Sequence, residues 1–350
     1  MPNELRWGIL SAGKISHDFA RAMRKCENPN VIRAVSATSF DRAQELVKHL
    51  GLENVQVYGS YDDMLNDPDV DVVYIGVQNQ AHCEWVCKAA EKGKHILCEK
   101  PIAVNAGELQ SMVKKAKENN VFLMEATWSR FFPVYRKLRE ALDKKEFGEL
   151  KVITAHFGNS TLADNRHMPE RGATPLNDIG IYTLQFALFC CDDQMPTSIK
   201  VHGSVDKEDG RDKGGNITLE FNNGMQKAYL VFSSEAWLTN SACVSFENGL
   251  YEIPDWFWCP TRMIKISGKP SAGKKQSEEF NFPLKDNPED FNFDNGSGMH
   301  YEADHVYECI KAGRLESQVM PLQTSLRLQE VLQELRNQMG VSYRQDENGH

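Results

Sequence analysis

The stretch VDVVYIGVQNQAHCEWVCKAAEKGKHILCEKP, residues 70–101, contains one complete strand–helix–strand unit. Residues 70–77 form a nearly continuous run of β-branched and other apolar side chains, which is typical of a strand buried on both faces. Residues 82–93 have a helical pattern that ends at Gly93, and residues 95–99 form a second short apolar run. This order predicts two parallel strands joined by a crossover helix.

The same alternation extends in both directions through the first third of the chain. Further strands are expected at 5–10, 31–38 and 121–128, and further helices at 14–26, 41–51 and 106–120. Short strands that alternate with longer helices predict a parallel sheet with helices on its faces, as in a Rossmann domain. We place this domain at residues 1–128.

The pattern changes after about residue 130. Turn signals such as Asn248-Gly249 separate strand-like segments, which favours antiparallel neighbours. The predicted fold class is therefore α/β, with an N-terminal Rossmann domain and a C-terminal α+β domain, residues 129–350, that has a large, mostly antiparallel open sheet. Strands are expected at 149–158, 197–205, 215–223, 225–234, 241–248, 261–268 and 277–283, and helices at 133–145, near 175–190, 299–313 and 322–339.

Composition excludes several classes of function. The 350 residues carry a net charge of −9, and no basic run offsets it, which argues against nucleic acid or an anionic membrane as a partner. No apolar stretch is long enough to span a membrane, and the N-terminus does not resemble a signal peptide, so a cytoplasmic location is expected. Cys83 and Cys87 lie beside His82, but no second ligand pair follows at zinc-site spacing, and no metal is expected.

The first predicted strand leads into GILSAGKIS, residues 8–16. The three glycine positions of the dinucleotide fingerprint G-x-G-x-x-G are occupied by Ser11, Gly13 and Ser16. Gly13 would let the backbone approach a pyrophosphate, and Lys14 and Ile15 begin a helix whose positive end suits phosphate groups. Because one glycine and two serines at such a turn occur in many α/β proteins, this motif alone leaves cofactor binding a hypothesis.

The end of the second predicted strand, SATSFDR at residues 36–42, indicates which cofactor would bind. An NAD site usually has an acidic residue here for the ribose 2′-hydroxyl, but this chain has Thr38 and Ser39. Their short side chains leave room for a 2′-phosphate, and Arg42 can pair with that phosphate. Asp41 is expected to open the following helix near its N-cap. The segment therefore favours NADP over NAD.

Several segments together resemble the glucose–fructose oxidoreductase/inositol dehydrogenase (Gfo/Idh/MocA) family of NAD(P)-dependent enzymes. The block at 76–101, which ends in Glu99-Lys100-Pro101, is the most specific of them. The resemblance extends from Arg6 to Val341, and its narrower features are similar to those members that oxidise trans-dihydrodiols or D-xylose. The supporting segments are RWGILSAGKIS (6–16), FLMEATWSRFFP (122–133), DIGIY (178–182), FWCPT (257–261) and NFDNGSGMHYEADHV (292–306).

The resemblance implies a catalytic lysine at Lys100 and an acid–base residue at Tyr182, with Asp178 four residues earlier on the same helix face. Many family members have histidine where this chain has Tyr182. Tyrosine has an ordinary pKa near 10, and a nearby ammonium such as that of Lys100 would lower it. Tyr182 would then take the proton of a substrate hydroxyl while the adjacent carbon gives a hydride to NADP.

Other residues are assigned to binding. Aromatic side chains could form an apolar wall for a dihydrodiol ring or for the carbon face of a sugar, and these are Trp128, Phe157, Trp258 and Phe293. Residues at the carboxyl ends of strands could meet the nicotinamide half of the cofactor, and these are Gln78, Asn79, His82, Glu99 and Lys100.

Alternatives remain at this point. The substrate could be a trans-dihydrodiol, which would give a catechol, or D-xylose, which would give a lactone. The chain could also be an NADP-binding regulator or scaffold without turnover, or a dehydrogenase of another polyol such as an inositol. The family further implies a homodimer formed through the C-terminal sheet.

Overall fold

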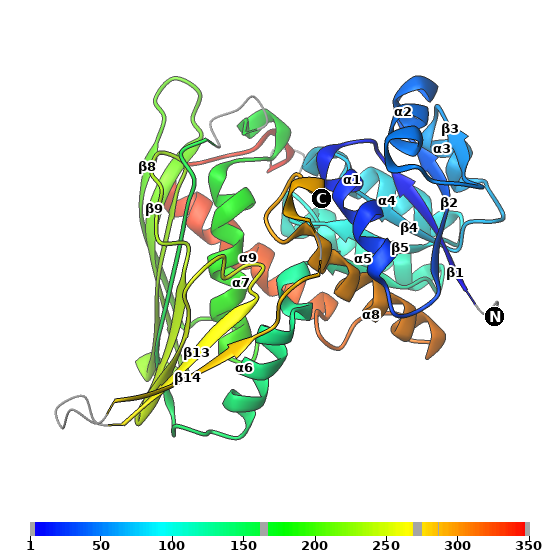
Figure 1. The fold of residues 1–350 in the computed structure, drawn as a ribbon. Coiled ribbons are helices and arrows are strands. Elements are labelled where there is room, and N and C mark those ends of the chain that lie inside the picture. The colour runs from blue at the N-terminus through cyan, green and yellow to red at the C-terminus, as the bar shows by residue number, and fades with distance from the viewer. Residues whose placement is uncertain (1–3, 162–166, 269–274, 286, 347–350) are drawn as a thin grey trace. The chain divides into compact units, whose positions relative to one another are not determined.

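The computed structural model describes residues 4–161, 167–268, 275–285 and 287–346 of the chain (Figure 1). The chain forms two compact units. The first unit extends to Phe131 and also contains the segment Leu284–Ser325, whereas the second comprises Phe132–Pro283 and continues from Leu326. The second domain was predicted as one continuous stretch, residues 129–350, whereas the segment Leu284–Ser325 groups with the first unit.

The first unit is built on a six-stranded parallel sheet with the strand order β3-β2-β1-β4-β5-β6. This order reverses direction between β1 and β4, which is where α/β sheets of this kind bind their ligands, at the carboxyl ends of the strands. The sheet confirms the predicted Rossmann class. The strands are β1 (Leu5–Leu10), β2 (Asn30–Ser36), β3 (Gln56–Tyr58), β4 (Val72–Ile75), β5 (His95–Glu99) and β6 (Leu123–Ala126).

Helices connect these strands, and their ends follow local capping rules. Ser39 caps α2 by accepting a hydrogen bond from the Arg42 N–H, and Gly51 ends that helix at φ = 57°. The helix predicted at 14–26 is shorter, because its last turn is a 3₁₀ turn at Met23–Lys25. The helices are α1 (Lys14–Ala22), α2 (Phe40–Leu50), α3 (Tyr61–Leu65), α4 (His82–Glu91) and α5 (Ala106–Glu118).

The segment that returns to the first unit is held by buried and half-buried carboxylates. The backbone N–H groups of Asn292 and Phe293 donate to the carboxylate of Asp18 on α1, at 2.8 and 2.9 Å. Asp304, on α8 (His300–Lys311), accepts from the backbone N–H groups of Glu27 and Asn28. These bonds explain why the segment belongs with the Rossmann sheet although it lies far away in the sequence.

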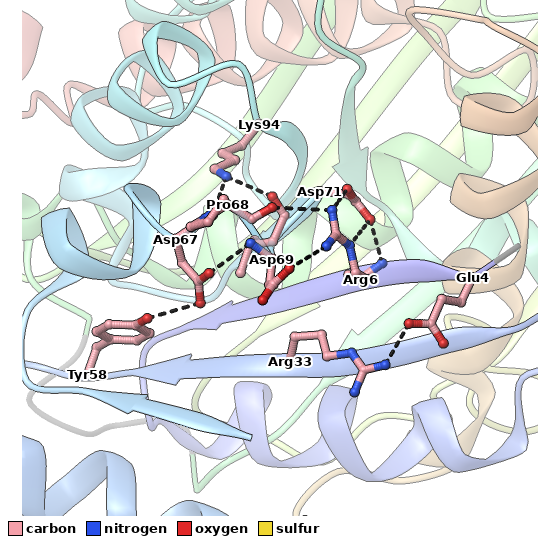
Figure 2. A network of polar contacts seen from close by, with 10 residues as sticks. Glu4, Arg6, Arg33, Tyr58, Asp67, Pro68, Asp69, Asp71 and Lys94 are labelled. Carbon is pink, nitrogen blue, oxygen red and sulfur yellow. Dashed lines mark hydrogen bonds and ion pairs between the residues drawn. The ribbon is translucent and has the colours of Figure 1, made fainter. Parts of the chain in front are cut away.

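A network of polar contacts lies at the amino end of the same sheet (Figure 2). Arg6 on β1 donates to both carboxylate oxygens of Asp71, at 2.7 and 2.9 Å, and to Asp69 at 2.7 Å. The Lys94 ammonium donates to the carbonyl oxygens of Asp67 and Val70. Burial would raise the pKa of Asp71, but the bonds from Arg6 outweigh it and lower the pKa. The network ties β1 to the loop before β4, at the end of the sheet opposite the expected ligand edge.

The second unit contains an eight-stranded sheet with the order β14-β13-β12-β11-β7-β10-β9-β8. Only the β7–β10 pair among its described neighbours is parallel, so the sheet is mostly antiparallel, as predicted. The strands are β7 (Leu150–Gly158), β8 (Ser198–Val205), β9 (Asp212–Phe221), β10 (Gln226–Ser233), β11 (Ala242–Phe246), β12 (Gly249–Ile253), β13 (Arg262–Ser267) and β14 (Gln276–Asn281).

Helix α7 (Ile181–Cys190) forms the core of the second unit. All of its residues are buried, and it packs against β7 and β10, as expected for a helix that is apolar on every side. A π-helical turn, Leu176–Gly180, precedes it without a break. The other helices are α6 (Pro133–Asp143) and α9 (Leu322–Met339). Among the described residues, no helix is long and apolar enough to cross a membrane.

Candidate functional site

The turn after β1 is built from small side chains. Ser11 has a positive φ of 113°, and its hydroxyl donates to the Gly76 carbonyl at 2.7 Å. Ser16 lies 2.7 Å from the Ser11 hydroxyl, and it must be the donor because Ser11 gives its proton to Gly76. A Cβ on Gly76 would lie 2.5 Å from the Ser16 hydroxyl, so any larger residue would displace that hydroxyl from its bond to Ser11. Gly76, which follows directly after β4, was not predicted as a site residue.

Gly13 is the N-cap of α1 and offers no side chain to the first N–H groups of that helix. Its φ of −83° suits any residue, and a Cβ there would lie 3.7 Å from the Ser11 hydroxyl, an ordinary contact. The fold itself therefore has room for a side chain at Gly13. An uncapped helix start with a bare backbone in front of it fits a phosphate group. Lys14 is exposed and Ile15 half-buried at this end.

The carboxyl end of β2 presents hydroxyl groups and a cation. Thr38 and Ser39 are exposed, and the Arg42 guanidinium reaches back to the Thr38 hydroxyl at 3.5 Å. Asp41 lies in the first turn of α2, while Ser39 is the N-cap itself. The hydroxyl and guanidinium groups can donate to phosphate oxygens.

His82 is the first residue of α4 and was predicted to meet the cofactor, but both of its ring nitrogens lie against backbone carbonyl groups of the protein. Its ring is fully buried, with Nδ1 2.9 Å from the Pro101 carbonyl and Nε2 3.1 Å from the Val77 carbonyl. Burial lowers its pKa. A neutral imidazole has one N–H, so His82 donates to one of these two carbonyl groups and lies against the other, between the turn after β5 and the residues that follow β4. Gln78 beside it is exposed and Asn79 half-buried.

The Glu99-Lys100-Pro101 turn is held from inside the first unit. The Tyr74 hydroxyl donates to Glu99 Oε1 at 2.5 Å, and the backbone N–H of Lys100 donates to Glu99 Oε2 at 3.1 Å. The Lys100–Pro101 peptide bond is cis, and Lys100 is half-buried. Glu99 therefore supports the turn at the carboxyl edge of the sheet. A further carboxylate, Glu125 on β6, accepts from the Ile102 N–H at 3.0 Å.

A third buried acid, Glu302, is affected by the charge of Glu99 and was not predicted as a site residue. Glu302 on α8 is 1% exposed, and burial together with the charge of Glu99 raises its pKa well above the ordinary value. In the sequence, Glu302 is marked only by its position in residues 292–306, one of the segments that carry the family resemblance. Trp128 is buried in this unit too, and Phe293 is half-buried with its backbone N–H on Asp18.

The second unit brings three predicted residues together. The rings of Phe157 on β7 and Trp258 are stacked, with centroids 3.7 Å apart and planes 10° apart. The Tyr182 ring lies 5.8 Å from Phe157 and 6.4 Å from Trp258. All three side chains are largely buried. A phenol thus sits against a flat apolar pair, an arrangement that can hold a ring or the carbon face of a sugar.

Asp178 belongs to the π-helical turn that runs into the helix of Tyr182. Its Oδ2 lies 2.9 Å from Nε2 of His167, which is almost fully buried. The predicted i, i+4 relation between Asp178 and Tyr182 assumed regular α-helix, and the π turn changes that geometry. Sequence reasoning missed His167, since no local spacing connects it to Asp178.

Comparisons with known proteins agree with this architecture. Residues 5–127 match the model of an oxidoreductase family with an NAD-binding Rossmann fold, and residues 135–252 match the GFO/IDH/MocA C-terminal domain. The trans-1,2-dihydrobenzene-1,2-diol dehydrogenases of Sus scrofa and Homo sapiens are 38% and 37% identical to the chain; each match covers 98% of this chain and 99% of the relative.

A solved structure shows the same fold. KijD10, a 3-ketoreductase from Actinomadura kijaniata in complex with NADP and TDP-benzene, superposes with a TM-score of 0.78 at 20% identity, over 97% of this chain and 98% of the other. Among the described residues, no cluster of three or more His, Cys, Asp or Glu side chains is arranged to hold a metal. The chain belongs to the Gfo/Idh/MocA family of NAD(P)-dependent oxidoreductases and is similar to its dihydrodiol dehydrogenases.

Proposed function

We propose that this protein is an NADP-dependent dehydrogenase of a vicinal diol or a sugar hydroxyl. The candidate reactions are the oxidation of trans-1,2-dihydrobenzene-1,2-diol to catechol and of D-xylose to its lactone. The observation that carries this assignment is the Tyr182 phenol set against the stacked Phe157–Trp258 pair. An ionisable hydroxyl beside an apolar wall suits a small ring that carries hydroxyl groups.

NADP is the cofactor that the first unit fits best. The uncapped start of α1 behind Gly13 suits the pyrophosphate, and the Thr38 hydroxyl with the Arg42 guanidinium suits the 2′-phosphate. When bound, the nicotinamide of NADP accepts a hydride from the substrate carbon. Two features of the sequence support NADP over NAD. The chain has no acidic residue at Thr38 or Ser39 to bind a 2′-hydroxyl, and Arg42 can pair with a 2′-phosphate.

We assign three residues to the reaction itself. Tyr182 takes the proton from the substrate hydroxyl and returns one in the reverse direction. Lys100 supplies a positive charge for the reacting oxygen, and an ammonium of this kind favours phenolate over phenol. Asp178, held by His167 at 2.9 Å, orients the substrate hydroxyl groups. Trp128 and Phe293 are kept as further candidate substrate contacts.

The test combines a substrate panel with one variant. NADP⁺ and NAD⁺ reduction is measured against trans-dihydrodiols, pentoses and inositols. Replacing Tyr182 with Phe should lower kcat by about 100-fold or more, because positioned acid–base catalysis contributes that much, while NADPH binding is unchanged. Tyr135→Phe is the matched control: it removes another buried phenol hydroxyl, bonded to Phe257 at 3.1 Å and Gln185 at 2.9 Å, and should keep turnover.

Other outcomes favour other functions. Full activity in the Tyr182→Phe enzyme would overturn the assignment of the acid–base residue. Tight NADPH binding without turnover of any substrate would favour the regulator or scaffold, and activity confined to inositols would favour a dehydrogenase of another polyol.

A further inference from the structure

The helical segment that carries Asp178 and Tyr182 begins at a buried carboxylate from another element. The backbone N–H of Leu176, the first residue of the π turn, donates to Asp212 Oδ1 at 2.7 Å. Pro175 stands at the N-cap and has no side-chain hydrogen bond to offer. Asp212, the first residue of β9, is fully buried and replaces the local cap.

Burial disfavours the charged form of the Asp212 carboxylate. Burial raises the pKa of Asp212 to about 6, so it is largely ionised at neutral pH. Its second oxygen, Oδ2, has no hydrogen-bond partner within the described part of the chain. The Thr174 side chain, whose hydroxyl lies 2.7 Å from that of Tyr343, and the charge of His167 lower the pKa of Asp212 but do not outweigh burial. Burying a carboxylate with one unsatisfied oxygen is costly, so its place at the start of the π turn calls for an explanation.

The position of Asp212 links it to the candidate catalytic residues. Asp178 lies within the π turn that Asp212 holds, and Tyr182 follows in the first turn of α7. A π turn is rare in proteins and is often found at functional sites. Loss of the bond to Leu176 would release the start of this segment. Even a displacement of about 1 Å in a catalytic group can cost roughly 100-fold in rate.

We propose that Asp212 is a positioning residue for the reaction: its carboxylate fixes the start of the π turn and thereby the placement of Asp178 and Tyr182. The role rests on the proposed function, since it matters for turnover only if Tyr182 and Asp178 act on the substrate. Asp212 itself is not expected to touch the substrate.

The test compares two replacements of Asp212. Asp212→Ala removes the acceptor for the Leu176 N–H and should lower kcat by about 10-fold or more, while KM for NADP⁺ is unchanged because Thr38, Arg42 and Gly13 lie in the other unit. Asp212→Asn keeps an oxygen acceptor and should restore most of the lost kcat. Asp212→Ser, whose hydroxyl is shorter, replaces the alanine variant if that protein does not fold.

The control removes a helix cap that has no link to the reaction. Ser60→Ala deletes the hydroxyl that accepts from the Asp63 N–H at 3.3 Å at the start of α3, and it should lower thermal stability without changing kcat. An Asp212→Ala or Asp212→Ser enzyme that is less stable but has an unchanged kcat would overturn the positioning role. So would an Asp212→Asn enzyme as slow as the alanine variant.

The two proposals fail in different ways. If the wild type turns over no diol or sugar of the panel, the proposed function is wrong. If Tyr182→Phe is fully active, the assignment of Tyr182 as the acid–base residue is wrong, whatever Asp212→Ala does. If Tyr182→Phe is inactive and Asp212→Ala has normal kcat, only the positioning role is wrong.

Discussion

Glu302 on α8 is the residue whose burial has the clearest consequence for stability. It is 1% exposed, and neither carboxylate oxygen has a hydrogen-bond partner among the described residues. Burial and the nearby charge of Glu99 raise its pKa well above the ordinary 4.5. Because the folded-state pKa is higher than that of the unfolded chain, Glu302 favours folding at low pH, and this contribution is lost as the pH rises from 4.5 through the folded pKa.

Replacing Glu302 with Gln should remove this pH dependence, since the amide resembles the protonated acid and cannot ionise. In the pH range where only the unfolded state ionises at Glu302, the wild type should lose up to about 1.4 kcal/mol of stability per pH unit relative to the variant. Thermal unfolding of both proteins, measured between pH 5 and 9 at steps of about one pH unit, gives the difference in stability between wild type and variant at each pH.

The exposed Glu84 on α4 provides the control for this experiment. Its carboxylate pairs with Lys88 at the surface, at 3.0 Å, so Glu84→Gln removes an exposed carboxylate by the same chemical change and its curve is measured beside that of Glu302→Gln. Parallel curves for wild type and Glu302→Gln would show that Glu302 is ionised in the folded protein and that its burial has been misread.

At the scale of elements, the start of α2 is expected to decide between NADP and NAD. Arg42 reaches Thr38 across the first turn, and the end of β2 offers no carboxylate at Thr38 or Ser39. Arg42→Ala should raise KM for NADP⁺ by roughly 10- to 100-fold, as expected for a lost hydrogen bond to a charged group, and leave KM for NAD⁺ unchanged. Initial rates with both cofactors give the two constants.

Arg33 supplies a matched control within the same sheet. It lies on β2 and pairs with Glu4 at 2.6 Å, so Arg33→Ala removes an arginine without touching the end of that strand. The ratio of the two KM values should stay as in the wild type. An equal loss for NADP⁺ and NAD⁺ in the Arg42 variant would contradict a 2′-phosphate role.

The elements that the sequence predicted well share a physical reason. The core strands of the Rossmann sheet are buried runs between turn residues, as at 70–77, and such runs have a strong local signal. Strand β3 has only three residues, and β12 follows β11 after a tight turn, so neither was predicted. The contacts of Glu302, His167 and Asp212 join residues far apart in sequence, and no local spacing could have indicated them.

For the whole molecule, the outer face of the second unit's sheet is the surface where we expect a second copy to bind. Residues paired across neighbouring strands point to the same face, and one such row centres on Tyr229 of β10. Tyr229 is 45% exposed, although its neighbours Ala228 and Leu230 are buried on the opposite face. The same row contains Lys200, Thr218, Thr154, Cys243 and Glu252. An exposed aromatic within the face of an eight-stranded sheet suits association through that face.

A charge in the centre of this face should separate the copies. The chain has a mass of 39.7 kDa, so a dimer has twice that mass. Light scattering should find the dimer for the wild type and the single-chain mass for Tyr229→Glu, because an unpaired charge is costly to bury in an interface. Met225→Glu is the control: Met225 is 61% exposed but lies in the turn before β10, and its replacement should leave the dimer intact. A monomeric wild type, or a dimeric Tyr229→Glu protein, would rule out this face as the interface.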